Sequence, residues 1–238
     1  MAFYKEKNKK IMIVTAHADD ETLGMGGTIS KLSGLGYEIM LLAVAINANK
    51  QLIKELGFSS IASYRSSKIK SLKAAVKILG ISSYKVFDYN ATELPKLFPN
   101  EIIKKIKCEI DAFKPSSIYT HFREDINQDH RVLHMAVMTA ARPKVNFFIQ
   151  NIFTFEIPNS TGWNGSYEHT NFHPNYFEVI EEKHLKKKIE AFKCYVSELE
   201  SPPSLHSEDG IVTCAKFRGM SVGYEYGESF EMLRCISI

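Results

Sequence analysis

Apolar runs and amphipathic stretches alternate along the first half of this chain. Short runs of apolar and often β-branched residues predict buried strands at Lys10–Ala16, Glu38–Ile46, Lys85–Phe87 and Ser117–Thr120. Apolar residues at helical spacing predict helices at Thr28–Gly34, Ser63–Leu79 and Pro95–Phe113. Strands that alternate with helices are typical of a parallel, doubly wound sheet with helices on both faces. The pattern therefore predicts an α/β fold.

The second half is less regular. It predicts an aromatic-rich strand in Asn146–Glu156, an amphipathic helix at Glu181–Ser197 and a last helix near Gly210–Gly219. Between them, Asn159–Pro174 is predicted to be a loop, dense in Asn, Gly and His and long enough to suggest a function. Because the sequence contains neither repeats nor a linker, we expect a single domain covering residues 1–238.

Composition and charge exclude several classes of protein. The chain has 238 residues, 45% of them hydrophobic, and a formal net charge of +3, with no basic run interleaved with aromatics, which argues against nucleic acid as a partner. No apolar stretch approaches the ~20 residues that cross a bilayer, and Met1–Lys10 lacks the apolar core of a signal peptide. The four cysteines are scattered, which favours reduced thiols and a cytoplasmic protein.

Ionisable residues are concentrated where the first predicted strand ends. His17, Asp19, Asp20 and Glu21 fall within five positions, directly after a buried apolar run. Like charges this close repel one another and lose hydration on burial. A divalent metal ion is the most economical group that could compensate them.

A second polar cluster, 121–131, follows the fourth predicted strand. The carboxyl ends of parallel strands meet at one edge of a sheet, so the two clusters should lie together. His17, Asp20 and His130 would then supply two imidazoles and one carboxylate, a ligand set typical of catalytic zinc. Asp19 could take a proton from water.

Other polar residues receive more ordinary interpretations. Asp129 could orient the His130 ring, while His121 either lines the site or caps an element. His184 and the run Lys186–Lys188 are expected on a solvated helix face. The remaining histidines are interpreted as structural at His134 and as loop residues, one of which could touch substrate, at His169, His173 and His206.

Taken together, the two clusters resemble the PIG-L/LmbE-like family of zinc-dependent de-N-acetylases. His17–Glu21 is similar to the family's A-H-P-D-D-E signature, with Ala18 in place of Pro, and Asp125–Arg131 is similar to its H-P-D-H motif. Later blocks are similar as well, so the resemblance covers nearly the whole chain. It implies a Rossmann-like, mainly parallel central sheet flanked by helices.

The resemblance also implies a reaction and a ligand set. His17, Asp20 and His130 would bind one divalent ion per chain, Zn²⁺ or alternatively Fe²⁺, and Asp19 would be the general base. Water activated at the metal would hydrolyse the N-acetyl group of an N-acetylglucosamine-type sugar or conjugate. The expected partner is thus a small-molecule N-acetyl amino sugar, with self-association into a homo-oligomer left open.

Two positions need separate treatment within this resemblance. Many relatives carry His where this chain has Asn127, whose amide can donate a hydrogen bond to an oxyanion but cannot supply a proton. Asp19 would therefore act first as base and then as acid. Arg65, where the family usually places Arg, could bind a sugar hydroxyl or a phosphate with its fork of donors, the alternative being an exposed residue at a helix start.

Two other functions compete with this one. The first is a metal-dependent deacylase of a non-sugar amide. The second is a non-catalytic Rossmann-like module that binds a nucleotide through the turn containing Gly24, Gly26 and Gly27, although the G-x-G-x-x-G pattern is incomplete there. Asp19 beside Asp20 favours an enzyme, because a binding module does not need a second carboxylate next to a metal ligand.

Overall fold

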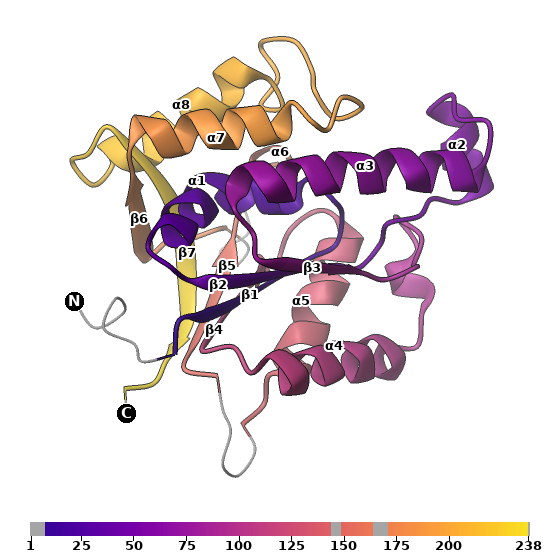
Figure 1. Cartoon of the computed structure of the whole chain (residues 1–238), viewed down its shortest axis with the longest axis horizontal. Helices are drawn as coiled ribbons and strands as arrows, with labels where there is room; N and C mark the ends of the chain where they lie inside the picture. Colours follow the sequence, from indigo (N-terminus) through magenta and orange to yellow (C-terminus); the bar gives the residue numbers. More distant parts are fainter. Residues whose placement is uncertain (1–7, 144–148, 164–170, 238) are drawn as a thin grey trace.

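One mixed sheet organises the protein, seen in a computed structural model that describes residues 8–143, 149–163 and 171–237. Across these residues the strand order is β3-β2-β1-β4-β5-β7-β6 (Figure 1). The first five are parallel, whereas β7 runs antiparallel to both of its neighbours. The strands are β1 Lys10–Thr15, β2 Glu38–Ala43, β3 Ser83–Val86, β4 Ser117–His121, β5 Asn151–Phe155, β6 Tyr176–Ile180 and β7 Tyr226–Cys235. The predicted α/β fold with a mainly parallel sheet is confirmed.

Helices cover both faces of the sheet (Figure 1). One face carries α1 Asp20–Gly34, α3 Ile61–Leu79, α7 Glu182–Phe192 and α8 Glu208–Met220, and the other carries α4 Pro99–Phe113 and α5 Gln128–Ala140. Shorter elements are α2 Lys50–Glu55, η2 Leu94–Lys96 and α6 Pro158–Thr161. In β1, Ile11 and Ile13 pack into the first core, while Met12 and Val14 pack into the second. Burial on both faces explains why this strand is a continuous apolar run.

One local prediction is wrong. Helix α1 begins at Asp20 instead of near Thr28, so the glycine-rich segment is helical and not a turn. The predicted loop at 159–174 begins with the end of α6, and its residues 164–170, with His169, lie outside the described residues. The sequence pattern also missed β6, a short strand that pairs with β7 at the edge of the sheet.

Helix α1 is broken at Met25 (φ −153°, ψ 26°), and a buried ion pair caps both sides of the break. Glu228 of β7 accepts hydrogen bonds from the backbone N–H groups of Gly27 (3.0 Å) and Thr28 (2.6 Å). Lys188 of α7 donates to the carbonyl oxygen of Leu23 (2.8 Å) and to Glu228 (2.6 Å). The anion thus lies at the new helix start and the cation at the preceding helix end, as the helix dipole favours.

Two side chains expected on a solvated helix face are buried instead. Lys188 is 5% exposed, because it pairs with Glu228, which lies on strand β7 and 40 residues further along the chain. His184 is 7% exposed, and its Nδ1 accepts a hydrogen bond from the Glu181 N–H at the start of α7. The amphipathic pattern of this helix does not distinguish a buried, paired cation from a solvated one.

The glycines of α1 permit close packing. A Cβ at Gly24 would lie 2.4 Å from the ring of Phe155, and one at Gly27 would lie 2.5 Å from Ile180 Cδ1. A phosphate at this turn would also need backbone N–H groups, yet those of Gly27 and Thr28 are bound to Glu228. The glycine-rich segment is therefore a packing surface, which argues against a nucleotide site here.

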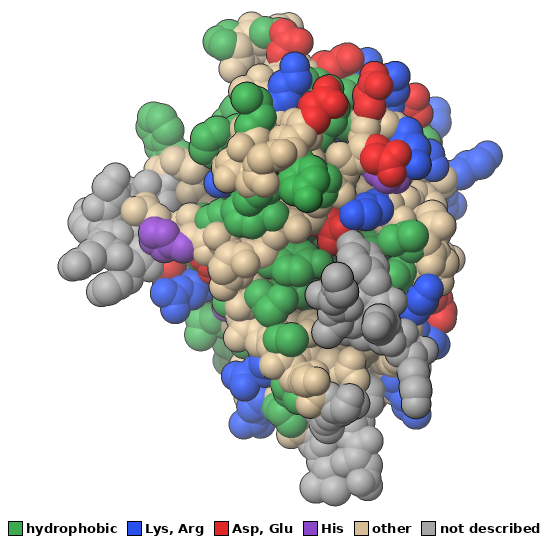
Figure 2. Space-filling view, turned by 90° about the vertical axis from the view of Figure 1, so that its left-hand side faces the viewer, with side chains coloured by type: hydrophobic (Ala, Val, Ile, Leu, Met, Phe, Trp, Pro, Cys, Tyr) green, Lys and Arg blue, Asp and Glu red, His purple; other side chains and the backbone are tan. Residues whose placement is uncertain are grey.

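The β6 edge of the sheet forms one face of the molecule. Apolar side chains gather along the middle of this face, with charged ones mainly above and beside them (Figure 2).

No helix among the described residues combines the length and apolar character needed to cross a membrane. All four cysteines are free thiols.

Breaking the buried pair should destabilise the whole fold. Glu228→Ala leaves Lys188 buried without its partner and removes the cap from two helix N–H groups, so we expect a loss of about 3–5 kcal/mol in the free energy of unfolding. Urea denaturation measures it. Glu182→Ala is the matched control, because Glu182 pairs with Lys186 on the surface of α7, and its loss should leave the free energy of unfolding nearly unchanged. Equal losses in the two variants would contradict this role.

Candidate active site

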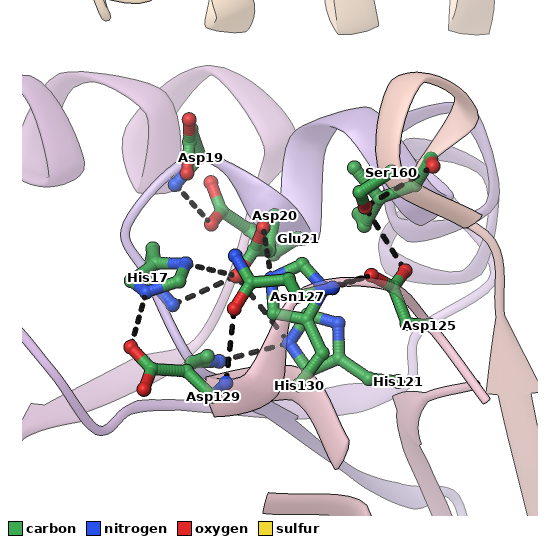
Figure 3. Close-up of polar contacts among 12 residues, drawn as sticks. His17, Asp19, Asp20, Glu21, His121, Asp125, Asn127, Asp129, His130 and Ser160 are labelled. Carbon is green, nitrogen blue, oxygen red and sulfur yellow. Dashed lines mark hydrogen bonds and ion pairs between the residues drawn. The ribbon is translucent and has the colours of Figure 1, made fainter. Parts of the chain in front are cut away.

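The carboxyl ends of β1 and β4 bring the two polar clusters together. The two strands are neighbours, with Ile13 in register with Tyr119. In the strand order, β2 is the neighbour of β1 on one side and β4 is its neighbour on the other side. Ligands of such folds bind where the strand order diverges in this way. Figure 3 shows the resulting arrangement of His17 and Asp20 around His130.

The three predicted metal ligands converge at this position. One potential ligand atom from each of His17, Asp20 and His130 lies within 4.8 Å of the others. The two Asp20 oxygens lie 3.4 Å from His17 Nδ1 and 3.5 Å from His130 Nε2. Ligands bonded to one tetrahedral ion at ~2.0–2.2 Å are roughly 3.3–3.6 Å apart. Each histidine therefore lies at ligand-to-ligand distance from one Asp20 oxygen, and the three side chains form a potential metal-binding group.

The hydrogen bonding of His130 supports the same interpretation. The side chain is 2% exposed, and among the described residues its Nε2 has no hydrogen-bond partner. Leaving a buried polar atom without a partner costs about 1–3 kcal/mol. A cation between His130 and Asp20 would satisfy Nε2, so the residues present fit a divalent metal.

The ring of His17 is held by Asp129, which corrects the expectation that Asp129 orients His130. Its Nε2 lies 3.0 Å from Asp129 Oδ2, which leaves Nδ1 facing Asp20. Asp129 also accepts hydrogen bonds from the backbone N–H groups of Thr92 (2.6 Å) and Leu94 (3.1 Å). Backbone groups of the segment after β3 therefore hold the Asp129 carboxylate in place, and Asp129 in turn orients the His17 ring.

Asp125 takes the place expected for Asp129. Its Oδ1 lies 3.3 Å from His130 Nδ1. The other oxygen accepts hydrogen bonds from the hydroxyls of Ser160 (2.9 Å) and Thr161 (2.5 Å) at α6. Each histidine of the candidate metal centre therefore has its own supporting carboxylate.

His121 lies beneath the ligands and not in the cavity. It is fully buried, its Nε2 accepts a hydrogen bond from the Ala16 N–H (2.9 Å), and its ring stacks on His130 at 3.8 Å between centroids. Burial and the adjacent His130 lower the pKa of His121 to about 4. The predicted substrate contact is thus replaced by a neutral packing role. His134 donates to the His121 carbonyl oxygen (2.9 Å), as a structural histidine does.

Asp19 has the properties of a proton acceptor. It precedes α1 with φ at +135°, a conformation unusual for a residue other than glycine, and its backbone N–H donates to Glu21 (3.1 Å). Its side chain lines the cavity without a hydrogen bond to another described residue. Burial, and then the charge of Asp20, raise the pKa of Asp19 well above its usual range, while Lys68 opposes the shift. Glu21 instead accepts from the Tyr195 hydroxyl (2.7 Å) and is a structural brace.

Asn127 both caps α5 and lines the cavity. Its side-chain oxygen accepts a hydrogen bond from the Asp129 N–H (2.9 Å), which fixes the orientation of the amide. The amide nitrogen is therefore on the other side, toward His17 and Asp20 in Figure 3. Asn127 therefore brings a side-chain amide to the lining of the cavity.

Arg65 lies on α3 outside the residues that line the cavity. Its Nη2 is 2.6 Å from Asp88 Oδ1, so its charge is already paired. Tyr64 and Lys68, one turn apart on the same helix, line the cavity instead. A role of Arg65 in substrate binding remains a prediction.

A cavity of about 270 Å³ opens above the candidate metal centre. Its lining includes the apolar side chains of Leu52 and Leu56 from the region of α2. It also includes Lys68 of α3, with Glu198 and His206 from the segment after α7. Sequence reasoning missed Lys68 and Glu198, because their proximity spans 130 residues and follows no local pattern.

The fold and the site define a class of protein: an α/β protein with a His, Asp, His cluster at the diverging edge of a Rossmann-like sheet. A family comparison agrees with it. Residues 12–141 match the PIG-L family (GlcNAc-PI de-N-acetylase), and the chain belongs to this family, which confirms the resemblance.

Individual relatives span most of the chain. It is 26% identical over 232 residues to the diacetylchitobiose deacetylase of Thermococcus kodakarensis, covering 94% of this chain and 83% of the relative. The structure of the N,N'-diacetylchitobiose deacetylase from Pyrococcus horikoshii matches with a TM-score of 0.74 at 20% identity over 96% and 85% of the chains. A hydratase shares the fold: the 4-carboxy-2-hydroxymuconate hydratase GalB from Pseudomonas putida matches with a TM-score of 0.76 at 19% identity over 96% and 98%.

Asp129→Asn should weaken metal binding through His17. The amide no longer favours the His17 tautomer with a proton on Nε2, so we expect the affinity for Zn²⁺ to fall by roughly 10- to 100-fold. Equilibrium dialysis against buffered Zn²⁺ measures it. Asp111→Asn, which loses only a surface pair with Lys107 on α4, should bind as the wild type does. Unchanged affinity in the folded Asp129→Asn protein would contradict this support role.

Proposed function

We propose that this chain is a zinc-dependent hydrolase that removes the N-acetyl group from an N-acetylated amino sugar or its conjugate. One observation carries the proposal: Asp19 lines the cavity beside His17, Asp20 and His130, whose potential ligand atoms lie within 4.8 Å of one another. Membership of a de-N-acetylase family and similarity to a deacetylase of diacetylchitobiose support the reaction and the sugar.

His17, Asp20 and His130 would hold the ion, with Zn²⁺ as the proposed metal and Fe²⁺ as the alternative. Two imidazoles and one carboxylate suit either ion, and they leave positions for water and substrate. A divalent ion bound there acts as a Lewis acid that polarises an acyl oxygen and makes water more acidic.

The residues of the chain would then move the protons. Asp19 takes a proton from the water that attacks the amide carbon, and its raised pKa lets it keep that proton. Asn127 donates from its amide nitrogen to the acyl oxygen, where negative charge develops. Asp19 finally gives the proton to the departing nitrogen as the C–N bond breaks, which yields acetate and a free amine.

The competing functions have less support. The N–H groups that a nucleotide phosphate would need at the glycine-rich segment are bound to Glu228. A non-sugar amide would use the same residues, and a substrate panel separates it from a sugar. The single domain, cytoplasmic location and self-association expected from the sequence stay predictions.

Acetate release tests the activity directly. We expect the Zn²⁺-loaded protein to release acetate from members of a panel of N-acetyl sugars and to contain about one metal ion per chain. Asp19→Asn should lower the rate by roughly 10²–10⁴-fold with zinc retained, whereas His130→Ala should lose most of the zinc. Loss of zinc in Asp19→Asn would make Asp19 a ligand and not the base.

Asn127→Ala tests the proposed oxyanion donor. Removing one such donor should lower kcat by roughly 10²–10³-fold while KM stays nearly constant. Asn127→His, which keeps a donor, should retain substantial activity and shift the acidic side of the pH–rate profile. Since Asn127 also caps α5, thermal unfolding is compared in the same variants. A kcat close to the wild type in Asn127→Ala would leave Asn127 a capping residue only.

A further inference from the structure

An ion pair forms part of the cavity wall, away from the proposed metal ligands. Lys68 projects from α3, and Glu198 comes from the segment after α7, a helix that packs along α3 (Figure 1). Lys68 Nζ donates to Glu198 Oε1. The Lys68 side chain is only 11% exposed and that of Glu198 is 28% exposed. The pair therefore belongs to the cavity lining and is largely shielded from bulk solvent.

The segment that carries Glu198 is fixed to the same turn that holds Asp19. Tyr195 donates its hydroxyl to Glu21, which in turn accepts from the Asp19 N–H. The Glu198 N–H donates to the Tyr195 carbonyl oxygen (2.8 Å), and the Ser197 hydroxyl donates to the Glu198 carboxylate (2.8 Å). A substrate that reaches Asp19 would thus meet the Lys68–Glu198 pair in a defined position.

The one Lys or Arg side chain among the described lining residues is already paired. That residue is Lys68, and the carboxylates of the lining are Asp19, Asp20 and Glu198. Arg65, the nearest cation considered from the sequence, lies outside the lining and is paired with Asp88.

This pairing has a consequence for substrate choice. Among the described lining residues, a phosphate or carboxylate on the sugar would find no lysine or arginine free of a carboxylate partner, and it would face Asp19 and Glu198 besides the ligand Asp20. Burying an unpaired charge is costly, and like charges repel. An uncharged sugar, by contrast, has hydroxyls that can both accept from an ammonium and donate to a carboxylate.

We propose that the Lys68–Glu198 pair selects an uncharged N-acetyl sugar, with Lys68 donating to a ring hydroxyl and Glu198 accepting from one. The inference rests on the proposed deacetylase function and narrows its substrate class. The cavity of about 270 Å³ is smaller than the ~300–1,000 Å³ of pockets for drug-sized ligands, so it suits a single sugar unit.

The experiment compares kcat/KM for N-acetylglucosamine with kcat/KM for its 1-phosphate and its 6-phosphate. We expect the zinc-loaded wild type to prefer the uncharged sugar over both phosphates by about tenfold or more. Glu198→Gln frees the Lys68 ammonium, so the ratio should shift toward at least one phosphate by about tenfold. Lys68→Gln leaves the Glu198 carboxylate unpaired and should shift the ratio the opposite way. Because the substrates share one reaction, the ratio cancels any general effect of these changes on Asp19.

Glu208→Gln is the matched control. Glu208 pairs with Lys193 at the start of α8, outside the cavity lining, so the ratio should stay at the wild-type value. Equal turnover of charged and uncharged sugars by the wild type, or an unchanged ratio in both folded pair variants, overturns the inference while the deacetylase function stands. Acetate release from none of the three sugars or the wider N-acetyl panel would reject the proposed function, and the inference would fall with it.

Discussion

Three consecutive carboxylates in a buried turn are the constraint on which the site depends. Asp19, Asp20 and Glu21 are each less than a tenth exposed. Burying a charge is costly, and each of the three carboxylates is compensated by a different environment. Asp20 faces imidazoles, which lower its pKa well below the usual range although burial alone would raise it. Glu21 accepts a hydrogen bond from the Tyr195 hydroxyl, whereas the charge of Asp19 is favoured by the nearby Lys68 and His17. One stretch of sequence thereby provides a candidate ligand, a brace and a candidate base.

Residues from the last third of the chain stabilise the start of α1 and the break within it. The break in α1 exposes N–H and carbonyl groups inside the protein, and Glu228 and Lys188 satisfy them from two different elements. Tyr195 braces the acidic turn from a third position. The family match covers residues 12–141, yet several supports of the proposed base come from beyond it. The position of Asp19 therefore depends on the packing of α7 and β7 against α1.

The sequence predicted what depends on local pattern. Apolar runs located five parallel strands, and the clusters at the ends of β1 and β4 led to the three candidate ligands. Proximity in sequence was misleading where contacts are distant: Asp129 adjoins His130 in the chain but contacts His17 in space. Lys188 seemed solvated because its partner lies in another element. Hydrophobic patterns do not indicate which distant polar residues pair with one another, so the residues that support the site could be identified only from the structure.

The fold alone does not choose the reaction, since a hydratase and deacetylases share it. Both reactions need water to lose a proton, but they differ in the atom that receives one. In amide hydrolysis the attacking water and the departing nitrogen are bonded to the same carbon, so one carboxyl group can serve both. Hydration of a double bond protonates the neighbouring carbon, which favours a second acid placed further away. Among the described lining residues, Asp19 is the one carboxyl group that is neither a predicted ligand nor ion-paired. A site with one such group is better suited to cleaving an amide than to hydrating a double bond.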